Sequence, residues 1–135
     1  MRYRLICAAV PALLALPAWS QDSAVVMRSG LVYESLRSGT GMPPRASDTV
    51  KVHYRGTLPG GKEFDSSYRR GIPAEFELGR VIPCWREGLQ LMKLGGRARL
   101  TCPPGLAYGT EGVGDVIPPN ATLTFEIELL GIKPR

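Results

Sequence analysis

The sequence predicts an α+β domain in which an antiparallel sheet of about five strands is wrapped around one short helix. Three observations indicate this fold class. Short runs rich in β-branched and aromatic residues are separated by clusters of Gly, Pro, Ser and Asp, which is typical of strands joined by turns. Two late runs alternate between apolar and polar residues, as strands with one buried face do. A single segment has the spacing of an amphipathic helix.

The N-terminal residues 1–20 have the features of a secretory signal peptide. Arg2 and Arg4 precede an apolar run that closes with small residues at Ala18 and Ser20. The alternative, a membrane anchor, fits less well because the run is shorter than the roughly 20 apolar residues of a spanning helix. We therefore expect a signal peptide over 1–20, a flexible segment over 21–29 and one domain over 30–135.

Removal of residues 1–20 leaves 15 basic against 12 acidic residues and a net charge of +3. The basic residues are scattered, with only Arg69 and Arg70 adjacent, so the sequence predicts no nucleic-acid partner. The rest of the chain has no apolar stretch long enough to cross a bilayer, so we expect no stable membrane insertion after cleavage. The protein is then periplasmic or secreted.

The stretch TVKVHYRG indicates a half-buried strand. Its apolar positions Val50, Val52 and Tyr54 alternate with polar ones. His53, the only histidine, falls on the polar face and is interpreted as a surface residue rather than a catalytic one. The following LPGGKEFDSSY predicts a hairpin turn over 59–61 and a second strand.

The stretch CWREGLQLMKLGG is the predicted helix, about ten residues long. Trp85, Leu89 and Met92 follow one another at intervals of four and three, which places them on one face. Pro83 stands near the start, and the pair Gly95 and Gly96 stops the helix.

Two alternating stretches, RARLTC and ATLTFEIELLGI, predict the last strands. Between them lie 17 residues, Pro103–Pro119, with four glycines and four prolines. A connection of this length without regular structure is usually functional in a compact domain. We therefore expect a functional site beside this loop.

Two cysteines remain after cleavage, Cys84 and Cys102, so a single disulfide is possible in an oxidising compartment. The alternative is a pair of buried free thiols. With one histidine in the chain, neither a redox dithiol nor a zinc site is indicated, and we expect no metal and no cofactor.

Nothing in the chain resembles a nucleophile with its base or a phosphate-binding glycine loop. Aromatic and aliphatic residues are instead concentrated beside turns, around the long loop and the start of the helix. Each could be plain core, but together they favour a concave apolar pocket with Asp65 and the Tyr108 hydroxyl among its polar groups. The apolar set comprises Tyr54, Phe64, Phe76, Val81, Ile82, Trp85, Tyr108, Ile117 and Phe125.

At these residues the sequence resembles the FKBP-type peptidyl-prolyl cis-trans isomerases, the family that binds the macrolide tacrolimus. The resemblance covers Asp48 to about Ile132, and its stretches are VKVHYRGTL, GKEFDSSY, VIPCWREGLQLMKLGGRARLTCPPGLAYG and IPPNATLTFEIELL. The stretch GLVYESLRSGTGMPPRASDTV further resembles secreted bacterial members of the macrophage-infectivity-potentiator type. Those members carry a helical dimerisation arm, whereas few residues separate the signal peptide from the domain here, so we expect a monomer.

The resemblance implies roles for individual residues. Trp85 would be the floor of the substrate pocket, and the Ile82 N–H and Tyr108 hydroxyl would donate hydrogen bonds to the carbonyls of the bound ligand. Asp65 would serve positioning or pocket polarity rather than proton transfer; alternatively it caps a turn. Implied substrate-binding residues are Tyr54, Phe64, Phe76, Val81, Trp85 and Phe125, and we add Ile117 from the apolar set.

The sequence departs from cytosolic eukaryotic members of that family at three positions. Ala74 replaces an aromatic residue and Val113 a histidine, which bears on ligand preference. Cys84 replaces a glycine, and its joint appearance with Cys102 favours the disulfide.

The implied partners are proline-containing polypeptides, with macrolide inhibitors such as tacrolimus. Two functions fit: an exported isomerase that accelerates rotation about X-Pro bonds without covalent catalysis, and a non-catalytic binding or chaperone module of the same fold. The retained aromatic set favours the enzyme.

Overall fold

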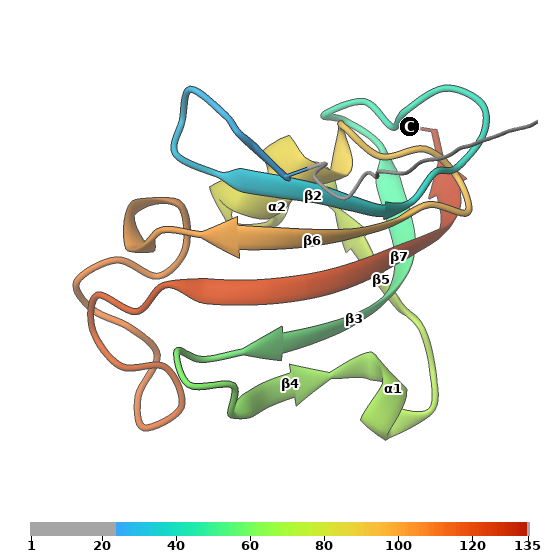
Figure 1. Cartoon of the computed structure of the whole chain (residues 1–135). Coiled ribbons are helices and arrows are strands. Elements are labelled where there is room, and N and C mark those ends of the chain that lie inside the picture. The colour runs from blue at the N-terminus through green and yellow to red at the C-terminus, as the bar shows by residue number, and fades with distance from the viewer. Residues whose placement is uncertain (1–23, 135) are drawn as a thin grey trace, which may run out of the picture.

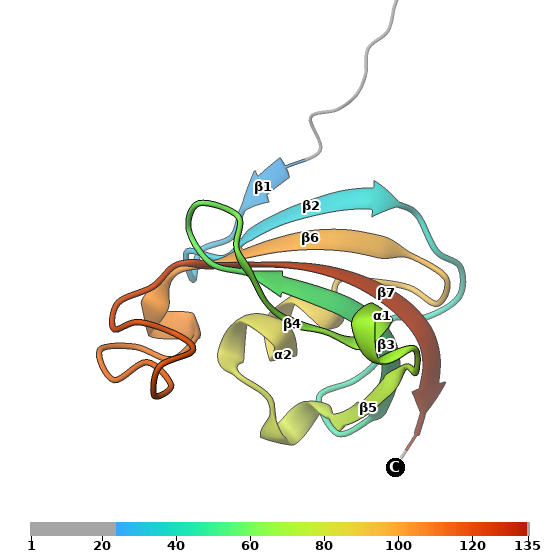
Figure 2. The same cartoon turned by 90° about the horizontal axis from the view of Figure 1, so that it is seen from below.

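Seven antiparallel strands form one sheet in the computed structural model, which describes residues 24–134. The predicted signal peptide, 1–20, and residues 21–23 lie outside the described residues. In spatial order the sheet runs β1-β2-β6-β7-β3-β4, and β5 pairs with β3 (Figure 1; β1 is labelled in Figure 2). The strands are β1 Ala24–Val26, β2 Val32–Arg37, β3 Thr49–Thr57, β4 Glu63–Ser66, β5 Ala74–Glu77, β6 Arg97–Cys102 and β7 Leu123–Lys133.

The expected α+β class is confirmed, but the sheet has two strands more than the expected five. β1 lies in the segment expected to be flexible, and it pairs with β2 through Ala24–Val26. β5 pairs with the first half of β3, from Thr49 to Val52. β1 is fully exposed and has no alternation, whereas the four residues of β5 alternate between apolar and polar but are too few for a strand prediction.

β3 is the central strand and follows the predicted alternation. Val50, Val52 and Tyr54 are buried, with β7 on one side and β4 and β5 on the other. The predicted hairpin after β3 is also present, because Gly61 N–H donates to the Leu58 carbonyl and β3 pairs with β4. The pairing of β3 with β4 brings Tyr54 of β3 close to Phe64 and Asp65 of β4.

The sheet curves around the helix α2, Pro83–Leu89, which lies in its concave side (Figure 2). Pro83 occupies the first turn, where its missing N–H costs nothing. The helix has seven residues rather than the expected ten, because the N–H groups of Leu91 and Met92 donate to carbonyls three residues earlier. The chain thus leaves the α-helix through tighter 3₁₀-type turns, and Met92 is still buried.

A disulfide joins Cys84 in α2 to Cys102 at the end of β6, and both residues are fully buried. This confirms the pairing expected from the sequence. The bridge ties the start of the helix to the point where the long loop leaves the sheet.

Short elements connect the strands near one end of the sheet. The helix α1, Ser67–Arg70, follows β4 directly and is capped by the Ser66 side chain, which accepts from the Arg69 N–H. A 3₁₀ turn, η2 Leu78–Arg80, precedes α2, and another, η3 Pro104–Leu106, opens the long loop. Within 24–134, no helix has the length and apolar character needed to cross a membrane.

Candidate functional site

A cavity of about 310 Å³ opens at the start of α2. Its walls come from β3, β4, β5, α2, β7 and the long loop. We call it the aromatic pocket, and its lining residues are Tyr54, Phe64, Asp65, Phe76, Arg80, Val81, Ile82, Trp85, Tyr108 and Phe125.

The structure brings together every residue that the sequence analysis assigned to the site, with one exception. Ile117 is 4% exposed, bridges to Val113 within the long loop and is not among the residues that line the pocket. It supports the loop from within the core. Arg80 lines the pocket and was not predicted, because a lone arginine in a turn leaves no sequence pattern.

The indole of Trp85 lines the pocket and is held by three aromatic rings at steep angles. The centroids of Tyr54 and Phe76 lie 5.1 Å from that of Trp85, and the centroid of Phe125 lies 5.3 Å away. All three contacts are edge-to-face, an arrangement that aromatic quadrupoles favour. Because the three rings come from three strands, the sheet fixes the orientation of the helical tryptophan.

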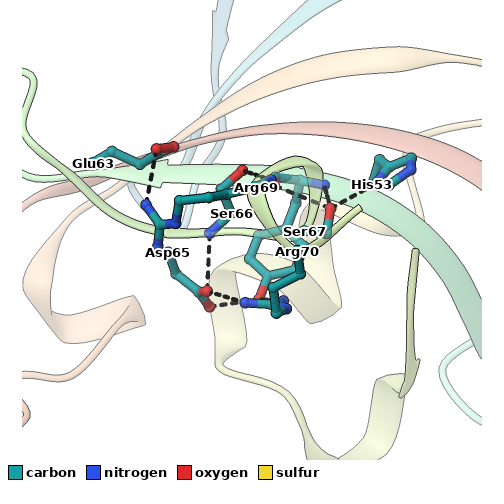
Figure 3. A network of polar contacts seen from close by, with 8 residues as sticks. His53, Glu63, Asp65, Ser66, Ser67, Arg69 and Arg70 are labelled. Atoms are coloured by element: carbon teal, nitrogen blue, oxygen red, sulfur yellow. Dashed lines mark hydrogen bonds and ion pairs between the residues drawn. The ribbon is translucent and has the colours of Figure 1, made fainter. Parts of the chain in front are cut away.

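Asp65 and Arg70 belong to a network of polar contacts (Figure 3), which reaches the aromatic cluster through the Tyr54 hydroxyl. Asp65 Oδ2 accepts from the Tyr54 hydroxyl at 2.5 Å, and Asp65 Oδ1 accepts from Arg70 at 2.6 Å and from the Ser66 N–H at 2.9 Å. Arg70 also donates to the Tyr54 hydroxyl at 3.0 Å. The pairing of β3 with β4 brings Tyr54 beside Asp65, and the turn from β4 into α1 brings Arg70 to both.

These contacts set the charge state of the network. Burial alone raises the pKa of Asp65, but the hydrogen bonds from Tyr54 and Arg70 outweigh it and hold that pKa below its ordinary value. Burial and the bond to Asp65 raise the pKa of Tyr54. Asp65 is therefore a carboxylate at neutral pH, with both oxygens occupied as acceptors.

Three hydrogen-bond donors on residues that line the pocket are without partners among residues 24–134. One is the indole N–H of Trp85, which is buried. The other two are the backbone N–H of Ile82 and the hydroxyl of Tyr108. Ile82 precedes α2, and its carbonyl accepts from the N–H groups of Trp85 and Arg86. Partial burial and the charge of Asp65 raise the pKa of Tyr108, so its hydroxyl stays protonated at neutral pH.

The segment that carries Ile82 is fastened by a neighbouring arginine. The Arg86 guanidinium donates to the carbonyls of Leu78 and Val81, both at 3.3 Å. Leu78 is fully buried, and its N–H donates to the Asp48 carbonyl. The wall from Leu78 to Ile82 is thus anchored at both ends.

His53 takes no part in the pocket. Its ring stacks on Tyr68 with 4.5 Å between centroids, and its Nδ1 lies 2.8 Å from Ser67 Oγ. It is half-buried by α1 rather than free on the surface. Within the described part of the chain, no group of three His, Cys, Asp or Glu side chains is placed to hold a metal ion.

Comparison with known proteins agrees with this geometry. Residues 41–130 match the family described as FKBP-type peptidyl-prolyl cis-trans isomerase. The chain belongs to this FKBP-type family. It is 56% identical over 106 residues to the isomerase FkpA of Escherichia coli strain K12, which covers 78% of this chain and 39% of FkpA. The crystal structure of E. coli FkpA matches with a TM-score of 0.81 and 52% identity over 84% of this chain and 53% of that chain.

A second relative matches the type expected from the sequence. Outer membrane protein MIP of Legionella longbeachae is 47% identical over 114 residues, which cover 84% of this chain and 49% of MIP. The FKBP-type chain described here therefore spans less than half the length of these two curated relatives.

The three residues that differ from the cytosolic members of the family lie in three different parts of the structure. Ala74 lies in β5 opposite Val52, and Val113 is 41% exposed in the long loop. Neither is among the residues lining the pocket. Cys84 is fully buried, next to Trp85 in α2, and forms the disulfide with Cys102.

Proposed function

We propose that this protein accelerates rotation about X-Pro peptide bonds in exported polypeptides, and that it acts as a monomer. The observation that carries the proposal is that the Ile82 N–H and the Tyr108 hydroxyl, two donors without partners among residues 24–134, belong to a pocket that is also lined by the indole of Trp85. An X-Pro segment offers two carbonyls for such donors. Tacrolimus-type macrolides, which carry similar carbonyls beside a ring, would compete for the same pocket.

The chemistry requires no bond to a nucleophile. Rotation about the peptide bond meets a barrier of about 18–20 kcal/mol because amide resonance must be broken. The twisted amide has lost resonance, and its carbonyl is less dipolar than that of the planar amide. A dry aromatic pocket therefore disfavours the planar ground state relative to the transition state. A hundred-thousand-fold acceleration needs only about 7 kcal/mol.

The residues divide the work. Trp85, Tyr54, Phe76 and Phe125 would hold the proline ring, while Ile82 and Tyr108 would hold the flanking carbonyls as the bond turns. Asp65 would position the Tyr54 ring through its short hydrogen bond. Because both Asp65 oxygens already accept from Tyr54 and Arg70, the carboxylate is ill suited to transfer a proton.

The test follows the cis-to-trans relaxation of a short peptide with an apolar residue before proline. The purified protein should accelerate it, and Tyr108→Phe should lower kcat/KM about fivefold, as expected for one lost hydrogen bond. Tyr68→Phe is the matched control, since Tyr68 is 42% exposed against 39% for Tyr108, and its hydroxyl donates to Glu128 outside the pocket.

A folded protein that binds the peptide without accelerating its relaxation would overturn the proposal. It would favour instead the non-catalytic binding or chaperone module of the same fold.

A further inference from the structure

Two charged side chains line the aromatic pocket, Asp65 and Arg80, and they differ in how strongly other groups of the protein pair with them. Asp65 has three hydrogen-bond donors within 2.9 Å. Arg80 has only an ion pair with Glu77, in which Nε lies 3.6 Å from Oε1 and the two side chains are 81% and 49% exposed. An exposed pair of this kind contributes little, so Arg80 can exchange Glu77 for another carboxylate at small cost.

The backbone of Arg80, unlike its side chain, is held in position by its neighbours. It lies between Leu78 and Val81, whose carbonyls both accept from the Arg86 guanidinium. Two residues further on is Ile82, the proposed backbone donor. The guanidinium of Arg80 is therefore a movable cation on a fixed segment, beside the place where a substrate carbonyl would bind.

A bound substrate would strengthen an interaction at this point. By covering the aromatic and aliphatic walls beside Arg80 it would exclude water from them, and the attraction between opposite charges would then be screened less than in the exposed pair with Glu77. The other arginine near the pocket, Arg70, is already engaged by Asp65 and Tyr54. Arg80 is thus the cation that a charged substrate side chain would meet.

We propose that Arg80 determines substrate specificity by binding the carboxylate of an Asp or Glu next to the proline of the substrate. The inference rests on the proposed function, because it takes the X-Pro segment to lie in the aromatic pocket. It assigns a substrate class: polypeptides with an acidic residue beside proline. Arginine suits this role because its guanidinium binds carboxylates through paired hydrogen bonds.

The experiment compares peptides that differ only in one side chain, Glu or its neutral counterpart Gln, placed before the proline in one pair and after it in another. kcat/KM and, by calorimetry, Kd are measured at low salt. In one of the two pairs the wild type should favour Glu by about three- to tenfold, and about 0.5 M salt should remove the preference. Arg80→Gln should abolish it, and Arg80→Glu should reverse it.

Lys133→Gln is the matched control. Lys133 lies 3.6 Å from Glu75, its side chain is 73% exposed, and it does not line the aromatic pocket. The variant removes the same single charge and should keep the full Glu preference. Equal values for Glu and Gln peptides in the wild type, or an unchanged preference in Arg80→Gln, would overturn the role of Arg80.

The two readouts separate the inference from the proposed function. If Glu peptides bind more tightly through Arg80 but no peptide is isomerised, the proposed function fails and the Arg80 site stands. If neutral peptides are isomerised and Glu gives no advantage in rate or affinity, the isomerase stands and the Arg80 site fails.

Discussion

The Tyr54 hydroxyl donates a 2.5 Å hydrogen bond to the Asp65 carboxylate, and this bond joins the aromatic pocket to the polar network of Arg70. The pKa of Asp65 is lower in the folded protein than its ordinary value. Ionised Asp65 therefore stabilises the fold at neutral pH, and this contribution disappears as the pH falls through the folded pKa.

The first prediction concerns this acid sensitivity. Between about pH 5 and about pH 2 the wild type should lose more free energy of unfolding than Asp65→Asn, which has no carboxylate to protonate. Urea denaturation at a series of pH values measures the difference. Asp115→Asn, a change in the exposed part of the long loop, should lose stability with acid as the wild type does. Parallel curves for wild type and Asp65→Asn would contradict the prediction.

The second prediction concerns the packing of α2 on β6. A Cβ atom on Gly88 would lie 2.6 Å from Leu100 Cδ1, in the buried core. Gly88→Ala should therefore destabilise the protein by about 1–3 kcal/mol through overpacking. Gly105→Ala is the control, since a Cβ there meets nothing within 4 Å, and it should change the free energy of unfolding by less than about 0.5 kcal/mol. Equal midpoints for the two variants in a denaturant titration would show that the packing of α2 on β6 does not require glycine at position 88.

The third prediction concerns the disulfide. Cys84 and Cys102 are 18 positions apart, and closing a loop of this length stabilises the fold by about 3 kcal/mol in the chain-entropy model. Protein refolded with reductant should lose about this much relative to the oxidised protein. A Cys84→Ala, Cys102→Ala double variant should not respond to reductant. If the oxidised and reduced wild type unfold at the same denaturant concentration, the bridge contributes nothing to stability.

The fourth prediction concerns alkaline pH. The raised pKa of Tyr108 means that its hydroxyl remains a donor above the pH, about 10, at which tyrosine normally ionises. Isomerase activity should stay level up to about pH 10 and fall only above it. Tyr108→Phe should be slower throughout but lack this fall, with circular dichroism confirming that both proteins remain folded. A decline near pH 8 in the wild type would be incompatible with the proposed role of Tyr108.

The sequence was sufficient for elements with a strong periodic pattern. Val50, Val52 and Tyr54 alternate with polar residues because one face of β3 is buried, and that pattern predicts the strand. The strands β1 and β5 were missed because they have three and four residues and no fully buried side chain. The length of α2 was overestimated because Met92 stays buried after the helix has ended, so the apolar spacing continues beyond it.

The site could be predicted only in part. Phe76 and Trp85 are nine positions apart, on different elements; their aromatic character favoured a shared pocket, but only the family resemblance implied a role for Trp85 as its floor. Arg70 was missed although it follows Asp65 by five positions, because the turn from β4 into α1 that brings them together has no signature of its own. Ile117 was assigned to the pocket by its apolar character, which a core position satisfies equally well.

The central claim, that X-Pro bonds turn within the aromatic pocket, can be tested by exchange NMR on a proline peptide with a catalytic amount of protein. Uncatalysed isomerisation takes tens to hundreds of seconds, so a mixing time of about 1 s detects catalysis alone. We predict cis–trans exchange peaks that disappear when saturating tacrolimus fills the pocket. Exchange peaks that persist beside the bound macrolide would place the rotation elsewhere and contradict the claim.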